Sequence, residues 1–226
     1  MSSTSVDSHS PLSILSTKQD TVWWLPRHEE KLAEKNAMAR VDLVFLGDSI
    51  TQAWEKEGAD VWQDFYQSRN ALNLGFNGDK TENVLWRLAH GEIDNIQPKL
   101  LVLLIGTNNA GHRMDKAEDT ALGIKQILSV LAEKLPKTKV LLLAIFPRSA
   151  KPTQKLRMLN NEVNQIIRTY ADDEKVFFRD INHVFLDEKG RITSDVMNDF
   201  LHPNTSQYQL FAEAIEPTIV SLLAEG

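Results

Sequence analysis

Short apolar runs alternate along this chain with longer segments whose apolar residues recur at helical spacing. Each run has the length of a buried strand and is too short for a buried helix. The runs predict strands at 41–46, 71–75, 100–105, 140–146 and 176–178. Strands that alternate with helices form a parallel sheet with helices on both faces, so the pattern predicts an α/β protein.

The segments between the runs predict the covering helices. They are expected over 27–40, around 61–65, and over 84–88, 121–135, 156–170 and 208–222. Asp79, with Glu82 three residues later, is typical of a capping box and would open the third of these helices. Pro217 is expected to bend or reset the last helix, because proline cannot donate the usual backbone hydrogen bond.

Chain topology narrows the fold further. Crossovers between parallel strands are right-handed, which leaves few arrangements, and the flavodoxin-like order is favoured. We therefore expect a three-layer α/β/α fold around a five-stranded parallel sheet. Residues 21–226 are expected to form one domain, and the Ser/Thr-rich residues 1–20 a flexible N-terminal arm.

Polar residues follow the predicted strands at the points where these end. Gly47-Asp48-Ser49 follows the first strand, Gly78 the second and Asn108 the third, while Asp199 and His202 precede the last helix. The carboxyl ends of parallel strands meet at one edge of a sheet, where ligands bind in open α/β folds. These residues can therefore converge although they lie far apart in sequence.

The chemistry of the converging groups is complementary. Ser49 can act as a nucleophile, His202 as its base, and Asp199 as the carboxylate that orients the base. The amides of Ser49, Gly78 and Asn108 could stabilise one developing oxyanion. Each residue also has a simpler interpretation, since serine caps helices, glycine permits positive φ and asparagine stabilises turns. Only their conjunction in this order favours catalysis.

These motifs resemble the SGNH (GDSL) hydrolases, a family of serine esterases with the flavodoxin-like fold. G-D-S-I, the N-x-G that ends at Gly78, G-T-N-N and D-x-x-H match blocks of that family. Residues 71–99, with L-I-G-T-N-N, P-R and D-F-L-H, look most like its group of type Ib intracellular platelet-activating-factor acetylhydrolases, in a bacterial form. The resemblance runs from about Val41 to the C-terminus.

The resemblance implies that Ser49, His202 and Asp199 form a catalytic triad and that Ser49, Gly78 and Asn108 form the oxyanion hole. Candidates for the substrate pocket are Asp48, Ile50, Asn109 and Leu201. If Ile50 and Leu201 wall the acyl side, a short acyl group such as acetyl is favoured. The implied reaction is hydrolysis of short-chain acyl esters of a carbohydrate or lipid-like alcohol through an acyl-enzyme, without metal or organic cofactor.

Two alternatives remain open from the sequence. A thioesterase or lysophospholipase would share the mechanism but would need a longer apolar groove. A non-catalytic ligand-binding module of the same fold would keep the cleft without turnover. A preference for long acyl chains would distinguish a thioesterase or lysophospholipase from an acetylesterase. A lack of esterase activity would indicate the non-catalytic module.

Composition limits the remaining function classes. A net charge of −6 argues against binding to nucleic acid or to anionic membranes. Without cysteine there are no disulfides and no thiolate chemistry, and the sequence predicts neither a signal peptide nor a membrane span, which favours the cytoplasm. The remaining histidines lack metal-ligand spacing: His9, His28, His90, His112 and His183. A small-molecule ester is the expected partner, and the resemblance is compatible with a homodimer.

Overall fold

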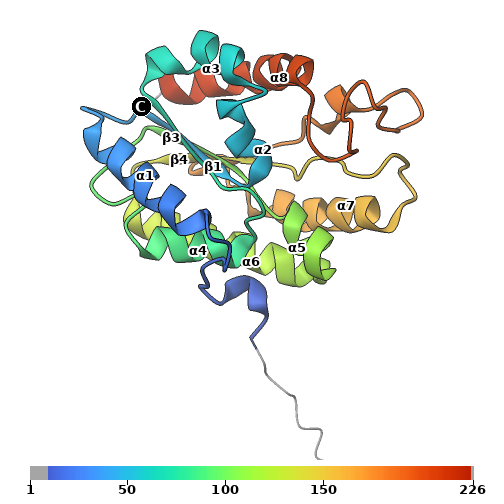
Figure 1. The fold of residues 1–226 in the computed structure, drawn as a ribbon, viewed down its shortest axis with the longest axis horizontal. Helices are drawn as coiled ribbons and strands as arrows, with labels where there is room; N and C mark the ends of the chain where they lie inside the picture. Colours follow the sequence, from blue (N-terminus) through green and yellow to red (C-terminus); the bar gives the residue numbers. More distant parts are fainter. Residues whose placement is uncertain (1–9, 225–226) are drawn as a thin grey trace, which may run out of the picture.

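The protein is described by a computed structural model, which covers residues 10–224. Its centre is a five-stranded parallel sheet with the strand order β2-β1-β3-β4-β5, which confirms the predicted flavodoxin-like fold (Figure 1). The strands are β1 (Leu43–Gly47), β2 (Ala71–Gly75), β3 (Leu100–Leu104), β4 (Lys139–Leu143) and β5 (Val176–Arg179). β1 pairs with β2 on one side and with β3 on the other. The chain therefore adds β2 toward one edge of the sheet and then returns past β1 to add β3 on the other side.

Helices cover both faces of the sheet, as Figure 1 shows. On one face lie α4 (Thr81–Ala89), α6 (Ala117–Lys134) and α7 (Lys155–Ile167), packed on β residues such as Val44 and Leu101. On the other lie α2 (Ser49–Gln52), α3 (Ala59–Phe65) and α8 (Thr205–Ala224), packed on residues such as Phe45 and Val102. Successive strand residues point to opposite faces, so the wholly apolar β1 and β3 contribute to both cores.

The remaining elements lie at the ends and margins of the sheet. They are α1 (Trp24–Ala37), α5 (Thr107–Arg113), η1 (Leu12–Ile14), η2 (Ala53–Glu55), η3 (Gln67–Arg69), η4 (Arg168–Tyr170) and η5 (Asn182–Phe185). Trp24, wholly buried at the start of α1, packs its ring against Phe76 and Trp86, so α1 is joined to β2 and α4. Among residues 10–224, no helix is long and apolar enough to cross a membrane.

Two sequence expectations differ from the structure. Helix α8 runs from Thr205 to Ala224 as one helix with Pro217 inside it, and is not reset there. The helix over 81–89 is capped by Lys80, whose N–H donates to the Asn83 side chain, and not by Asp79. Asp79 is instead wholly buried.

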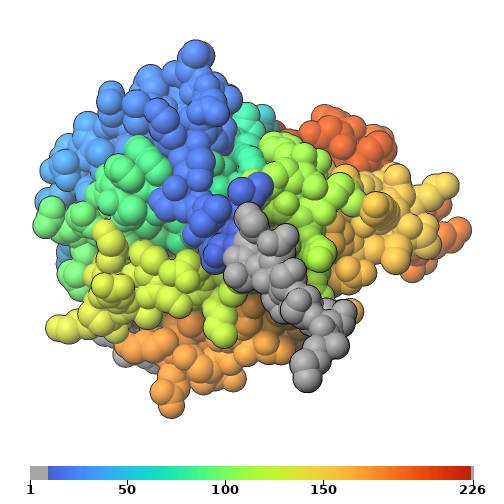
Figure 2. Space-filling view, turned by 90° about the horizontal axis from the view of Figure 1, so that it is seen from below, coloured from blue at the N-terminus to red at the C-terminus, as the bar shows by residue number. Residues whose placement is uncertain are grey.

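Residues 10–20, part of the segment expected to be a flexible arm, pack against the domain. The Thr17 N–H donates to the Glu82 carbonyl over 3.1 Å, and the Thr81 hydroxyl donates to the Ser13 carbonyl over 2.8 Å. Figure 2 shows these residues, in blue, lying against the helices of the lower face. Hydrogen bonds between polar groups hold this segment, and apolar periodicity does not reveal such bonds. The remainder of the expected arm, residues 1–9, lies outside the described residues.

Candidate active site

The turn after β1 presents Ser49 as the first residue of α2. The backbone approaches its neighbours closely there, because a Cβ added at Gly47 would lie 2.3 Å from the Leu104 carbonyl oxygen. The buried Asp48 carboxylate caps α2 by accepting the Ile50 N–H over 3.0 Å. Burial raises the pKa of Asp48 to about 7, with the hydrogen bond from Ile50 opposing the rise. The serine hydroxyl is thus fixed at the carboxyl edge of the sheet.

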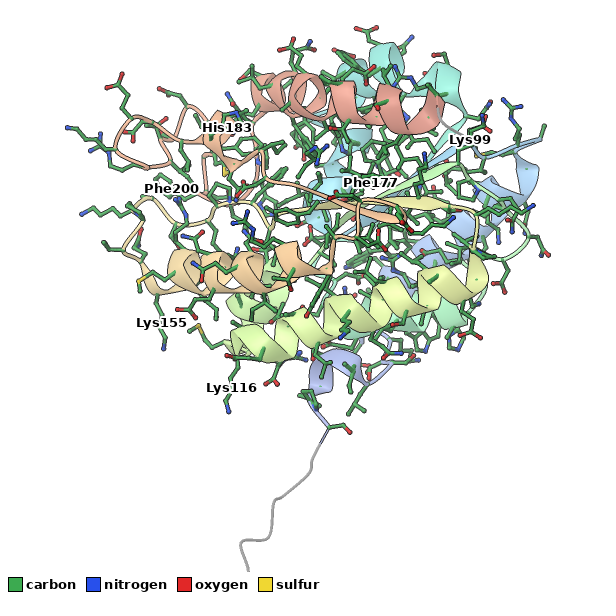
Figure 3. The ribbon with its side chains drawn as sticks, turned by 180° about the vertical axis from the view of Figure 1, so that it is seen from behind. Lys99, Lys116, Lys155, Phe177, His183 and Phe200 are labelled. Carbon is green, nitrogen blue, oxygen red and sulfur yellow. The ribbon has the colours of Figure 1, made fainter. Side chains whose placement is uncertain are left out.

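The loop before α8 brings His202 to that hydroxyl. His202 Nε2 lies 2.9 Å from Ser49 Oγ, and His202 Nδ1 lies 2.6 Å from Asp199 Oδ2. Asp199 Oδ1 also accepts the backbone N–H groups of Leu201 (3.0 Å) and His202 (2.8 Å). Phe200, which lies between Asp199 and Leu201, adopts a left-handed conformation with φ of 58°. Figure 3 shows Phe200 at one end of the molecule and Lys99, just ahead of β3, at the other.

The Asp199 carboxylate determines the proton positions in this chain of hydrogen bonds. Burial alone would raise the pKa of Asp199, but the hydrogen bonds from the His202 N–H and ring outweigh it and hold the pKa below its usual range. An ionised carboxylate only accepts, so His202 Nδ1 carries the proton and Nε2 is free to accept the Ser49 proton. This is the arrangement that a general base requires.

The turns after β1, β2 and β3, which are neighbours in the sheet, carry the three predicted amide donors. Gly78 lies in the turn after β2 with φ of 75°, a conformation that favours glycine. Within residues 10–224, neither the Ser49 nor the Gly78 N–H donates to another protein group. The buried Asn108 amide donates to the Asp79 carbonyl over 3.0 Å, which leaves its second N–H unassigned. Three donors are therefore available to an anion.

A hollow of about 650 Å³ opens beside Ser49 and His202. Most of its lining residues are polar in type, although polar and apolar atoms share its surface about equally. They come from the segment after β1, the turn after β2 and the loop before α8. They comprise Ser49, Gln52, Ala53, Lys56, Glu57, Asn77, Asn198, Asp199, His202, Pro203, Asn204 and Thr205. The sequence analysis missed Gln52, Ala53 and Lys56, although they follow Ser49 at the spacing of one helix face, which is the signal that could have found them.

The four residues expected to line a substrate pocket lie elsewhere than in this wall. Asp48, Ile50 and Asn109 are at most 1 % exposed, and Leu201 is half-buried. Ile50 packs in the core beneath the sheet edge. Asn109 ties α5 to α4 by accepting the Thr81 N–H over 3.1 Å. Asp48 and Asn109 therefore contribute hydrogen bonds, and Ile50 contributes core packing, but none of the three forms a wall of the hollow.

Asp79, the residue after Gly78, is the anion of a buried ion pair. Its carboxylate accepts from Trp24 Nε1 (2.6 Å), Gln19 Nε2 (2.6 Å) and Arg87 Nε (2.8 Å). Arg87 is also wholly buried and pairs with Glu92 as well. Sequence patterns could not reveal this network, because its members come from three separate segments.

The described residues hold no group of three or more histidine and acidic side chains that could bind a metal ion. Of the remaining histidines, His28 and His90 lie beside Trp86, and His112 lies near Gly78, with its Cε1 3.9 Å from a Cβ built there. His9 is outside the described residues. His112 thus lies beside the turn that carries Gly78.

The sequence of residues 45–210 matches the GDSL-like Lipase/Acylhydrolase family. The chain belongs to this family. It is 34% identical over 203 residues to human platelet-activating factor acetylhydrolase IB subunit alpha1, covering 89% of this chain and 85% of the human one. The rat subunit alpha2 is 35% identical over 185 residues, covering 81% and 78%. The chain is accordingly an ester hydrolase of the GDSL family.

Solved structures of bacterial enzymes share the fold. A GDSL-like lipase from Bacteroides thetaiotaomicron superposes with a TM-score of 0.71 at 21% identity, covering 86% of this chain and 97% of the lipase. An acetylxylan esterase from Geobacillus stearothermophilus superposes with a TM-score of 0.63 at 16% identity, covering 82% and 96%. The three-layer architecture of this GDSL hydrolase is thus common to enzymes of low sequence identity.

Proposed function

We propose that this GDSL hydrolase cleaves short-chain acyl esters, above all acetyl esters, with Ser49, His202 and Asp199 as its catalytic triad. The observation that carries the proposal is the hydrogen-bonded chain Ser49 Oγ–His202 Nε2 and His202 Nδ1–Asp199 Oδ2, at 2.9 and 2.6 Å. Its geometry and proton positions are those that nucleophilic acyl transfer needs.

The reaction follows from these contacts. His202 Nε2 takes the Ser49 proton as Oγ attacks the ester carbonyl carbon, and Asp199 stabilises the resulting imidazolium. The carbonyl oxygen becomes an oxyanion, which the Ser49 N–H, the Gly78 N–H and the second N–H of Asn108 stabilise. His202 then protonates the departing alcohol. Water, activated by the same base, hydrolyses the acyl-enzyme and releases the acid.

The walls of the hollow support a polar alcohol. Gln52, Asn77 and Asn198 offer amide donors that can bind hydroxyl groups, whereas a long alkyl chain would gain little from them. The acetylxylan esterase from Geobacillus stearothermophilus has the same fold, and the mammalian relatives are named platelet-activating factor acetylhydrolases. We propose a hydroxyl-rich alcohol, such as an acetylated saccharide, in preference to a lipid-like alcohol.

Hydrolysis of p-nitrophenyl esters of increasing acyl length tests the reaction. Wild type should be fastest on the acetate, and Ser49→Ala should lose about 10⁶-fold in kcat. Asn108→Ala should lose about 10²–10³-fold. Ser129→Ala, a substitution on an exposed face of α6, is the matched control and should keep full activity. Activity that survives in Ser49→Ala would refute the triad, and preference for long acyl chains would favour a lysophospholipase or thioesterase.

The choice of alcohol needs a second comparison. Release of acetate from an acetylated xylo-oligosaccharide and from an acetylated lysophospholipid should be measured with wild type and Asn198→Leu, a substitution of an exposed residue that lines the hollow. We expect the saccharide to be the better substrate, and Asn198→Leu to raise its KM more than that of the lipid. The opposite order would assign the lipid-like alcohol to this hollow.

A further inference from the structure

We propose that Gln19 is a positioning residue for the oxyanion hole, so that the segment ahead of α1 takes part in catalysis. The proposal rests on the function proposed above, in which Gly78 and Asn108 stabilise the oxyanion. Gln19 lies in the segment that sequence patterns predict to be a flexible arm, and it contributes nothing to the hydrophobic core. Its contacts are nevertheless directed at the turn that carries Gly78.

The Gln19 side chain holds that turn from both sides of the glycine. Gln19 Nε2 donates to the Asn77 carbonyl over 3.0 Å and to Asp79 Oδ1 over 2.6 Å. A carboxamide nitrogen has two hydrogens, so both bonds can form at once. A Cβ built at Gly78 would lie 3.7 Å from both polar atoms of the Gln19 amide, which therefore covers the turn.

The turn has few bonds of its own to define it. Within it, the Asp79 N–H donates to the Phe76 carbonyl over 3.1 Å, and the Asn77 N–H donates to the Gln52 side chain over 2.7 Å. Among the residues that the structure describes, none accepts the N–H of Gly78, which lies between Asn77 and Asp79. Because glycine also has the greatest backbone freedom, the direction of this N–H depends on the groups that hold its neighbours.

The same contact reaches Asn108 through Asp79. The Asp79 carbonyl accepts one N–H of Asn108 over 3.0 Å and so sets the plane of its amide. The Asp79 carboxylate is in turn held by Gln19 and Trp24 from the N-terminal side and by Arg87 from α4. Gln19 therefore contacts the carboxylate of Asp79, the residue that follows Gly78 and whose carbonyl holds Asn108.

Gln19 is itself anchored on the helix that follows the turn. The Asn83 side chain donates to the Thr17 carbonyl over 2.9 Å, and the Thr17 N–H donates to the Glu82 carbonyl over 3.1 Å. Glu82 and Asn83 both belong to the first turn of α4, which begins three residues after Gly78. The segment and the turn thus share one rigid support, which keeps the Gln19 amide in register with them.

The test compares Gln19→Met, which keeps the length of the side chain and removes its donors, with Lys18→Met at the exposed neighbouring position. The full chain is assayed on p-nitrophenyl acetate, in the wild type and in Asn108→Ala. Gln19→Met should lower kcat about tenfold, a fraction of the loss of a whole oxyanion donor, with KM within about twofold of wild type. Lys18→Met should match wild type.

A merely structural role would give a different result in the second background. If Gln19 acts through the oxyanion hole, Gln19→Met and Asn108→Ala together should lose less than the product of their separate losses, because both act on the same set of donors, whereas general destabilisation would multiply the two losses. Gln19→Glu, which directs a carboxylate at Asp79, should lower kcat further than Gln19→Met and provides a second variant should the methionine fold poorly. A Gln19→Met enzyme equal to Lys18→Met, or losses that multiply, overturns the proposal.

Ser49→Ala in the same series separates the two proposals. If it loses activity while Gln19→Met behaves like its control, the triad stands and only the positioning role fails. If Ser49→Ala retains activity, both proposals fail.

Discussion

Removing Arg87 should destabilise this hydrolase more than any ordinary surface substitution. Its guanidinium is wholly buried, lies 2.8 Å from Asp79, pairs with Glu92 and sits 4.0 Å from the centre of the Phe76 ring. Arg87→Met keeps much of the side-chain volume but leaves two buried carboxylates without their cation. Breaking a buried pair by removing one partner costs about 3–5 kcal/mol. At about 2–4 °C per kcal/mol for a chain of this size, Tm should fall by about 6–20 °C.

The loss of folding stability in Arg87→Met should depend on pH. Burial raises the pKa of Asp79 and of Glu92, and Arg87 opposes the rise in both. Without Arg87, the pKa values of both carboxyl groups in the folded state rise further above their values in the unfolded state. Stability that comes from the protonated forms is present at low pH and is lost as pH rises through the folded values. The deficit of Arg87→Met should therefore be smaller near about pH 5 than near about pH 8.

Urea unfolding followed by tryptophan fluorescence measures the effect, since Trp24 contacts Asp79 directly. Arg87→Met with Asp79→Asn and Glu92→Gln is the repair variant, and it should recover part of the loss because no unpaired charge remains buried. A deficit below about 1 kcal/mol that does not change with pH would refute the reasoning.

Three further predictions concern the supports of Ser49. Asp48→Asn keeps an acceptor for the Ile50 N–H and removes a buried carboxylate whose pKa is raised to about 7. In urea unfolding, this variant should be more stable than wild type by at least about 1 kcal/mol near about pH 8, and by much less near about pH 5. Tyr208→Phe removes the hydroxyl that donates to the buried Ile50 carbonyl over 2.8 Å, and unfolding should show a loss of about 1–2 kcal/mol. Gly75→Ala would place a Cβ 2.0 Å from the Gln52 nitrogen, so α2 must shift, and both kcat and stability should fall, the latter by at least about 1–3 kcal/mol.

The fold was predictable because its signals are local and repeated. Apolar runs of strand length located β1 and β3, and helical spacing located α6 and α7 to within a few residues at each end. The handedness of parallel crossovers then left few strand orders, among which the flavodoxin-like order was favoured. The approach of Ser49 to His202 followed in the same way, because both residues belong at the carboxyl edge of such a sheet.

The supporting shell of the site was not predictable from the same signals. Asp79 has the spacing of a helix cap, but burial against Arg87 and Trp24 gives it another role. Trp24 is distant in sequence, and no sequence pattern marks Arg87 as a buried partner of Asp79. Ile50 adjoins the nucleophile in sequence, yet helix geometry turns its side chain into the core. Gln19 lies in a polar stretch that lacks apolar periodicity, so only side-chain hydrogen bonds reveal its place.

The left-handed backbone of Phe200 has a consequence for how this enzyme recovers from denaturation. A bulky residue in that conformation costs about 1–2 kcal/mol, so the loop does not take this shape unaided. It is held because the Phe200 ring packs on the core beneath the sheet and its carbonyl accepts the Ser149 N–H over 2.8 Å. We therefore expect the pairing of Asp199 with His202 to be among the last features to form on refolding. Regain of esterase activity should lag behind regain of helical circular dichroism, which makes turnover a stricter reporter of the native state than secondary structure.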